Sequence, residues 1–156
     1  MPDKDDKAAA ARAKRALKRG KQPSTAAGEF VREEIDHVRE GKHGARSPEQ
    51  AIAIGLSKAR RAGVPLKPPA RGKTSSRTRA SAERAYEVGQ GKRPAKAPSR
   101  RRSKATRRAL QHESRSSASR SALAKHAHRA ALRRKPAARS RAAKHAARTR
   151  HVRANG

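Results

Sequence analysis

The sequence predicts a mostly disordered chain with some α-helix, chiefly one small helical hairpin and fraying helices rich in Ala and Arg. The 156 residues hold 43 Lys and Arg against 12 Asp and Glu, a formal net charge of +31. Phe30 and Tyr86 are the only aromatic residues. Low hydrophobicity with high net charge is typical of disorder, because little apolar surface offsets the entropy of ordering the chain.

Composition divides the chain into four segments. We expect a flexible N-terminal arm at 1–27, a helical hairpin at 28–66, a linker at 67–80 and a basic, largely disordered tail at 81–156. Within the arm, acidic residues precede an Ala-rich basic run, which favours a fraying helix over 4–19 that ends at Gly20.

The first helix of the hairpin is predicted at about 29–40. Its apolar residues recur at helical spacing and form one stripe, Val31, Ile35 and Val38, with Phe30 beside it. Gly41 would end the helix. Its acidic residues indicate either a face for docking a partner or the tail, or solvated pairs such as Asp36 with Arg39, and we favour the solvated pairs.

The second helix is predicted at about 48–62, and its start has the clearest local signal in the chain. Ser47 and Gln50 fit a capping box, with Pro48 at the first helical position. Gly63 would stop the helix. The expected core residues are Ile52, Leu56 and Ala59.

The hairpin on its own would be marginally stable, because a core built from fewer than about 40 residues seldom suffices. We expect it to gain support from dimerisation, from Val64 and Leu66 folding back, or from bound nucleic acid.

The tail carries charge of one sign. Residues 79–156 hold 24 basic and 3 acidic residues, which indicates a polyanion partner. Arg predominates, and its planar fork suits bidentate phosphate contacts. From the hairpin and the tail, the residues predicted to contact phosphate are Lys58, Arg60, Arg61, Arg100, Arg101, Arg102, Lys104, Arg107, Arg108, Lys125, Arg129, Arg133, Arg134, Lys135, Arg141, Lys144 and Arg148.

Two sets of these cations would line helix faces. Lys125, Arg129 and Arg133 form the first set, and Arg141, Lys144 and Arg148 form the second. Like charges at this spacing oppose a free helix, so we expect helix formation on binding, with Pro136 separating the two helices.

Several classes of protein are disfavoured. No Cys is present, and the histidines of the tail lack the spacing of a metal site, so we expect neither cofactor nor metal. No catalytic arrangement has a scaffold, so we expect no enzyme and no small-molecule substrate. No run is apolar enough for a membrane span or an export signal, so we expect a cytoplasmic protein. Binding of DNA, inferred from the charge of the tail, would make it nucleoid-associated.

Residues 29–63 resemble a family of small basic bacterial proteins of unknown function. The resemblance rests on Gly41-Lys42 and on the Gln-Ala-Ile-Ala-Ile-x-Leu-Ser-x-Ala-Arg-x-Ala-Gly sequence at 50–63. The tail resembles the basic arms of linker histones and of bacterial histone-H1-like proteins, although it is rich in Arg rather than Lys. The second resemblance implies DNA condensation by charge neutralisation.

We therefore expect sequence-independent binding and compaction of DNA, because nothing in the tail suits base stacking or base readout. One alternative is an RNA-binding or ribosome-associated protein, since RNA offers the same phosphates. Another is an adaptor whose hairpin recruits a protein partner. The oligomeric state is left open.

Overall fold

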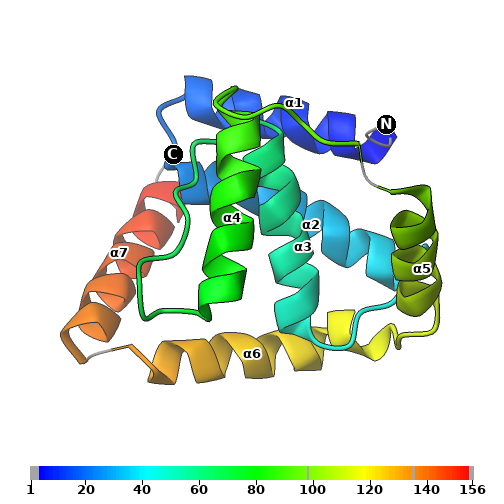
Figure 1. Cartoon of the computed structure of the whole chain (residues 1–156). Helices are drawn as coiled ribbons and strands as arrows, with labels where there is room; N and C mark the ends of the chain where they lie inside the picture. Colours follow the sequence, from blue (N-terminus) through cyan, green and yellow to red (C-terminus); the bar gives the residue numbers. More distant parts are fainter. Residues whose placement is uncertain (1–3, 98, 135, 155–156) are drawn as a thin grey trace. The chain divides into compact units, whose positions relative to one another are not determined.

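The computed structural model describes residues 4–97, 99–134 and 136–154, and this part of the chain is all-helical, without a strand (Figure 1). In chain order the elements are α1 (Lys4–Lys18), α2 (Pro23–Arg39), α3 (Pro48–Arg61), α4 (Ser76–Gly89), α5 (Arg100–Gln111), the 3₁₀ turn η1 (Ser116–Ala118), α6 (Arg120–Leu132) and α7 (Pro136–Ala154).

The expectation of a mostly disordered chain is not supported. Helices occupy most of the segments expected to be an arm and a tail, whereas the segment expected to be a linker is helical only from Ser76 onward. The physical reason is local: Ala and Arg are among the best helix formers, and a helix satisfies its own backbone hydrogen bonds without a large apolar core. The composition does show a shortage of large core residues. It does not report the helix propensity of Ala and Arg, which acts at each position of the chain.

The predicted hairpin is present as α2 and α3, although α2 begins at Pro23 rather than near 29. Ser47 Oγ accepts a hydrogen bond from Gln50 N over 3.3 Å, as the capping box requires. The Gln50 side chain reaches one residue further back than predicted, where Oε1 accepts from Arg46 N over 2.7 Å. Gly41 and Gly63 end the two helices at φ +77° and +90°, a conformation that favours glycine.

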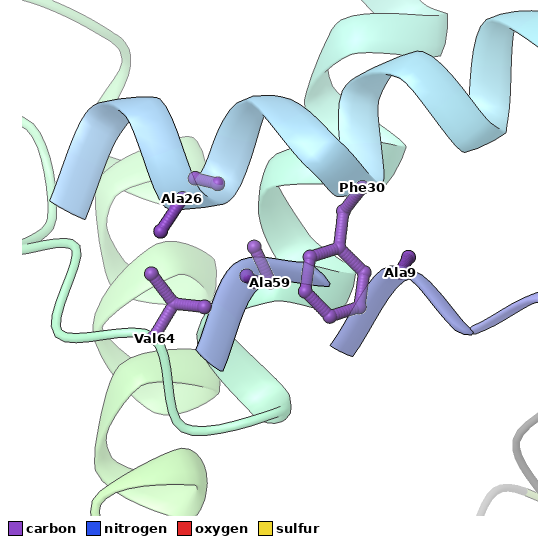
Figure 2. Packing of buried hydrophobic residues seen from close by; sticks show 7 residues of the cluster. Ala9, Ala26, Phe30, Ala59 and Val64 are labelled. Atoms are coloured by element: carbon purple, nitrogen blue, oxygen red, sulfur yellow. The ribbon is translucent and has the colours of Figure 1, made fainter. Parts of the chain in front are cut away.

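The core of the first four helices is built mainly from alanine. α1 packs against α2, α2 against α3, and α3 against α4. Phe30 is the one large side chain at the centre, and it lies among Ala9 of α1, Ala26 of α2 and Ala59 of α3 (Figure 2). Val64 folds back into this cluster, as the sequence predicted, and Leu66 packs against it. The hairpin is therefore supported by α1 and α4 rather than standing alone.

The buried stripes differ from the predicted ones. Val38 is fully buried, but Val31 and Ile35 are only partly buried, and the same holds for Ile52 and Leu56. The reason is the close approach of the two backbones, which places small residues at the centre of the contact and larger ones at its flanks. In α3 the buried positions include Ala51, Gly55 and Ala59.

A second, smaller cluster holds the segment after α5 against the hairpin. Val38, Ala45, Ala51 and Ala118 form it. Gly44 N donates to Leu110 O over 2.8 Å, and Ala45 N donates to Ser114 O over 3.1 Å. A side chain at position 44 would collide with the backbone of Glu113, so glycine is required at this point.

The chain divides into two compact units, Met1–Ser119 and Arg120–Gly156. The first unit contains α1 to α5 and η1. It includes α1, where Ala9 and Ala13 are buried, although residues 1–27 were expected to be a flexible arm. The second unit contains α6 and α7, and Pro136 starts α7 as predicted. No residue with described burial in this second unit is buried.

Candidate nucleic-acid interface

The acidic residues near the N-terminus are used inside the first unit. We call their meeting point the hub. It joins carboxylates of α1 and α2 to basic side chains of α2, α3 and the loop between α2 and α3. The hub consists of Asp5, Asp6, Glu33, Glu34, His37, Lys42, His43 and Lys58.

Distances within the hub are those of close ion pairs. Lys58 Nζ lies 3.0 Å from both Asp6 Oδ1 and Glu34 Oε2. Lys42 Nζ donates to Asp5 Oδ2 over 2.6 Å. Asp36 and Arg39 pair on the surface of α2 at 3.5 Å, as predicted. Most acidic residues of α2 thus contact other parts of the first unit, which leaves little of an acidic docking face.

These interactions shift the pKa values of the residues involved. The hydrogen bond from Lys42, with a second one from His37, holds the pKa of Asp5 below its ordinary value. Burial lowers the pKa of Lys58, but Asp6 and Glu34 outweigh burial and leave that pKa raised. Beside the hub, hydrogen bonds to Glu33 and Glu29 raise the pKa of Arg12. Lys58 and Arg12 therefore stay charged at neutral pH, and both are ion-paired with carboxylates.

The predicted contact residues of α3 are placed differently from one another. Lys58 is held in the hub. Arg60 is only 7% exposed, donates from Nε to Leu66 O over 3.1 Å, and has a pKa lowered by burial. Arg61 is exposed and donates to Ser57 Oγ over 3.1 Å. Of the three, Arg61 is the residue that α3 presents to solvent, because Lys58 and Arg60 face neighbouring segments.

The six predicted contact residues of α5 are all exposed. Four of them lie within an arc of about 100° around the helix. We call this arc the outer face of α5, and it consists of Arg100, Arg101, Lys104 and Arg108. Among the described residues, no carboxylate lies within ion-pair distance of these four. The outer face therefore carries uncompensated positive charge.

The second unit carries cations without any acidic side chain. Residues 120–156 hold 12 Lys and Arg and no Asp or Glu. Lys135 lies outside the described residues. The other predicted contact residues of this unit are exposed, namely Lys125, Arg129, Arg133, Arg134, Arg141, Lys144 and Arg148. The helical form of α7 places Arg141, Lys144 and Arg148 on one face, as predicted.

A cleft of about 1040 Å³ opens between the inner side of α5 and the hub. Its lining includes Arg102, Thr106 and Leu110 from α5. The hub contributes Glu34, His37 and His43. This acid–histidine group was missed by the sequence analysis, which weighed the histidines of the tail. The one available signal was the spacing of Glu34 and His37, which places both on one face of a helix.

No helix among the described residues has the length and apolar character needed to cross a membrane. Comparison of the chain with known protein families, with curated proteins and with solved structures gives no match.

Proposed function

We propose that this protein binds nucleic acid without reading its sequence, that duplex DNA is its main ligand, and that it compacts DNA by neutralising phosphates. The observation that carries the proposal is the separation of charge along the chain. All 12 acidic residues lie before residue 120. The charged side chains of the last 37 residues, counted as Lys, Arg, Asp and Glu, are all Lys and Arg. A unit with no acidic side chain of its own takes its counter-charge from solvent ions or from a polyanion.

The helical form of the cationic segments suits phosphate binding. α7 is about 28 Å long and carries cations on opposite faces, for example Arg141 and Arg150. Duplex DNA has one phosphate charge per about 1.7 Å of its axis, so a helix of this length passes more phosphates than it has cations. The outer face of α5 adds a second cationic surface.

RNA presents the same phosphates and is the competing ligand. An adaptor role for the hairpin has less support, since the acidic residues of α2 are mostly engaged within the first unit.

The test is a salt titration of the full chain against labelled ligands. Two duplexes of unrelated sequence and one RNA hairpin are compared by fluorescence anisotropy between 50 and 200 mM salt. Six to ten phosphate contacts predict a fall in affinity of about 10³- to 10⁵-fold over this range, equal for both duplexes. Binding that is insensitive to salt, or absent at low salt, contradicts the proposal. Stronger binding to the RNA hairpin at every salt concentration makes RNA the ligand.

A deletion of residues 120–156 tests the contribution of the second unit. The deletion starts at residue 120 and not at residue 81, where the predicted tail begins. A deletion from residue 81 would remove most of α4, which packs against α3 and places Gly89 against the backbone of Arg60. We expect the slope of log affinity against log salt to become shallower by several units, about 0.9 for each phosphate that the shortened chain no longer neutralises. Circular dichroism checks that the first unit keeps its helices. As a control, Arg-to-Lys changes at positions 133, 141 and 148 of the full chain retain most of the slope.

A further inference from the structure

Three side chains of the hub, Glu34, His37 and His43, bring possible metal ligands together at one point. Glu34 and His37 lie one turn apart on α2, and His43 returns to them from the loop that follows Gly41. Each offers one possible ligand atom, and the three atoms all lie within 4.8 Å of one another. Glu34 is 1% exposed and His37 is 4% exposed, so these two side chains are shielded from bulk water, whereas His43 is partly exposed.

The hydrogen bonding of His43 fixes which of its ring nitrogens faces this group. Nδ1 lies 3.0 Å from Gly44 O, which can only accept, so Nδ1 carries a hydrogen and donates. In the neutral ring Nε2 then has a lone pair, and it lies 3.2 Å from Glu34 Oε1. Two acceptor atoms at that distance repel each other unless a proton or a metal ion lies between them.

This arrangement matches the surroundings of a metal-binding histidine. Such a ring usually donates its remote N–H to a carbonyl or a carboxylate, which sets the tautomer and orients the ligating nitrogen. Gly44 O is in this position for His43.

The rest of the hub leaves Glu34 Oε1 available. Lys58 Nζ lies near the other oxygen, Oε2, at 3.0 Å. Among the described residues, Oε2 accepts no hydrogen bond of standard geometry. A carboxylate can hold a lysine through one oxygen and a metal ion through the other.

A neighbouring group of Asp5, Glu33 and His37 meets the same distance criterion. It fits a metal ion less well, because Asp5 Oδ2 already accepts a hydrogen bond from Lys42, and Glu33 accepts one from Arg12.

We propose that Glu34, His37 and His43 bind a divalent transition-metal ion, with zinc the best match. Two imidazole nitrogens and one carboxylate oxygen suit zinc, whereas calcium and magnesium prefer oxygen ligands alone. Zinc holds such ligands at about 2.0–2.2 Å. Each of the three ligand atoms therefore needs to move by less than about 1 Å to reach one shared ion. The fourth position opens toward the cleft that all three residues line.

A bound ion would also steady the docking of α5. His43 directly precedes Gly44 and Ala45, whose N–H groups hold the end of α5 and the segment after it. The ion ties this loop to α2, so its binding raises the melting temperature of the first unit.

The test uses the full chain, freed of metal with a chelator and titrated with Zn²⁺ by calorimetry, without nucleic acid. Co²⁺ serves as a spectroscopic probe, because its visible absorption reports coordination by protein ligands. We expect one equivalent bound per chain, together with a rise in melting temperature.

The main variant is His43→Gln, because His43 is partly exposed and its loss is tolerated more easily than that of buried Glu34. We expect zinc affinity to fall at least tenfold, since loss of even a residue behind a ligand costs about that much. Glu34→Gln is the second variant and should act in the same direction. The matched controls are His112→Gln, which changes an exposed histidine outside the group, and the double change of His126 and His128 to Gln. Both controls should retain the site. The proposal is overturned if no equivalent binds, or if binding survives both hub variants.

Discussion

Gly55 lies where α3 crosses α2, and the absence of its side chain sets the spacing of the two helices. A Cβ atom at this position would lie 2.7 Å from Val31 Cα and 2.9 Å from Phe30 O. Both are backbone atoms, which cannot move unless α2 itself shifts. A single methyl group at this point therefore acts on the whole hairpin.

We predict that Gly55→Ala lowers the free energy of unfolding by about 1–2 kcal/mol. Overpacking costs about 1–3 kcal/mol, and the better helix propensity of Ala returns up to about 1 kcal/mol of that. Urea unfolding followed by circular dichroism measures the change.

Gly28 provides the matched control, since it also lies in a helix of the hairpin, α2, but a Cβ there meets nothing within 4 Å. Gly28→Ala should leave stability unchanged or raise it by up to about 1 kcal/mol. Equal effects of the two substitutions would mean that the helices do not approach closely at Gly55.

At the scale of single elements, α5 has two sides with different surroundings. Its inner side lines the cleft together with the hub, through residues such as Arg102 and Thr106. Its outer face is exposed and has no carboxylate within ion-pair distance among the described residues. A change confined to the outer face should therefore alter binding to a polyanion and leave the packing of the first unit intact.

We predict that a quadruple variant, with Arg100, Arg101, Lys104 and Arg108 all changed to Gln, binds DNA more weakly. The slope of log affinity against log salt should become shallower by about two to four units, because up to four phosphates are then left without a protein cation. Changing the three arginines to Lys instead should keep most of the slope, since the charge is retained. Anisotropy at several salt concentrations measures both, and the melting temperature should stay near that of the wild type. An unchanged slope in the Gln variant would exclude α5 from the interface.

For the whole molecule, the separation of charge also governs stability. The net charge of +31 repels itself when no polyanion is bound. Added salt shortens the range of this repulsion, with a screening length of about 30 Å at 0.01 M and 10 Å at 0.1 M. The pairs of Lys58 with Asp6 and Glu34 are partly buried, so salt weakens them less than it weakens the repulsion between exposed cations.

We predict that the melting temperature of the free protein rises by several degrees between about 20 and 500 mM NaCl, because screening relieves the repulsion. Differential scanning calorimetry of the metal-free chain measures this. The variant that lacks residues 120–156 is the control, and it should show a smaller rise because it lacks the 12 Lys and Arg of that segment. A melting temperature that falls with salt would mean that the ion pairs of the first unit outweigh the repulsion.

The sequence was sufficient to predict features that depend on neighbouring residues. The capping box at Ser47, the glycines that end α2 and α3, and the return of Val64 to the core are all set within a few positions of the chain. The apolar stripe was only partly predicted, because Ile52 and Leu56 look like core residues by size, whereas the close crossing at Gly55 selects small ones.

The hub could not be predicted from the sequence, because its members come from positions as far apart as Asp5 and Lys58. Periodicity and spacing report on a single helix, and they contain nothing about which helix lies opposite. For the same reason the sequence did not predict that α1 forms part of the core. Ala9 and Ala13 resemble any other alanine in a basic run. Phosphate contact by the cations of α5, by contrast, was inferred from charge alone and stays a prediction.

An interior made of alanine changes which mutations matter. The largest fully buried side chains are Phe30, Glu34 and Val38, so at most interior positions there is almost no volume left to remove. Truncation, the usual way to damage a protein core, has few targets in this molecule. Enlargement has many, and substitutions as mild as Ala to Val would force neighbouring helices apart. The stability of this fold therefore depends mainly on keeping the buried alanines small.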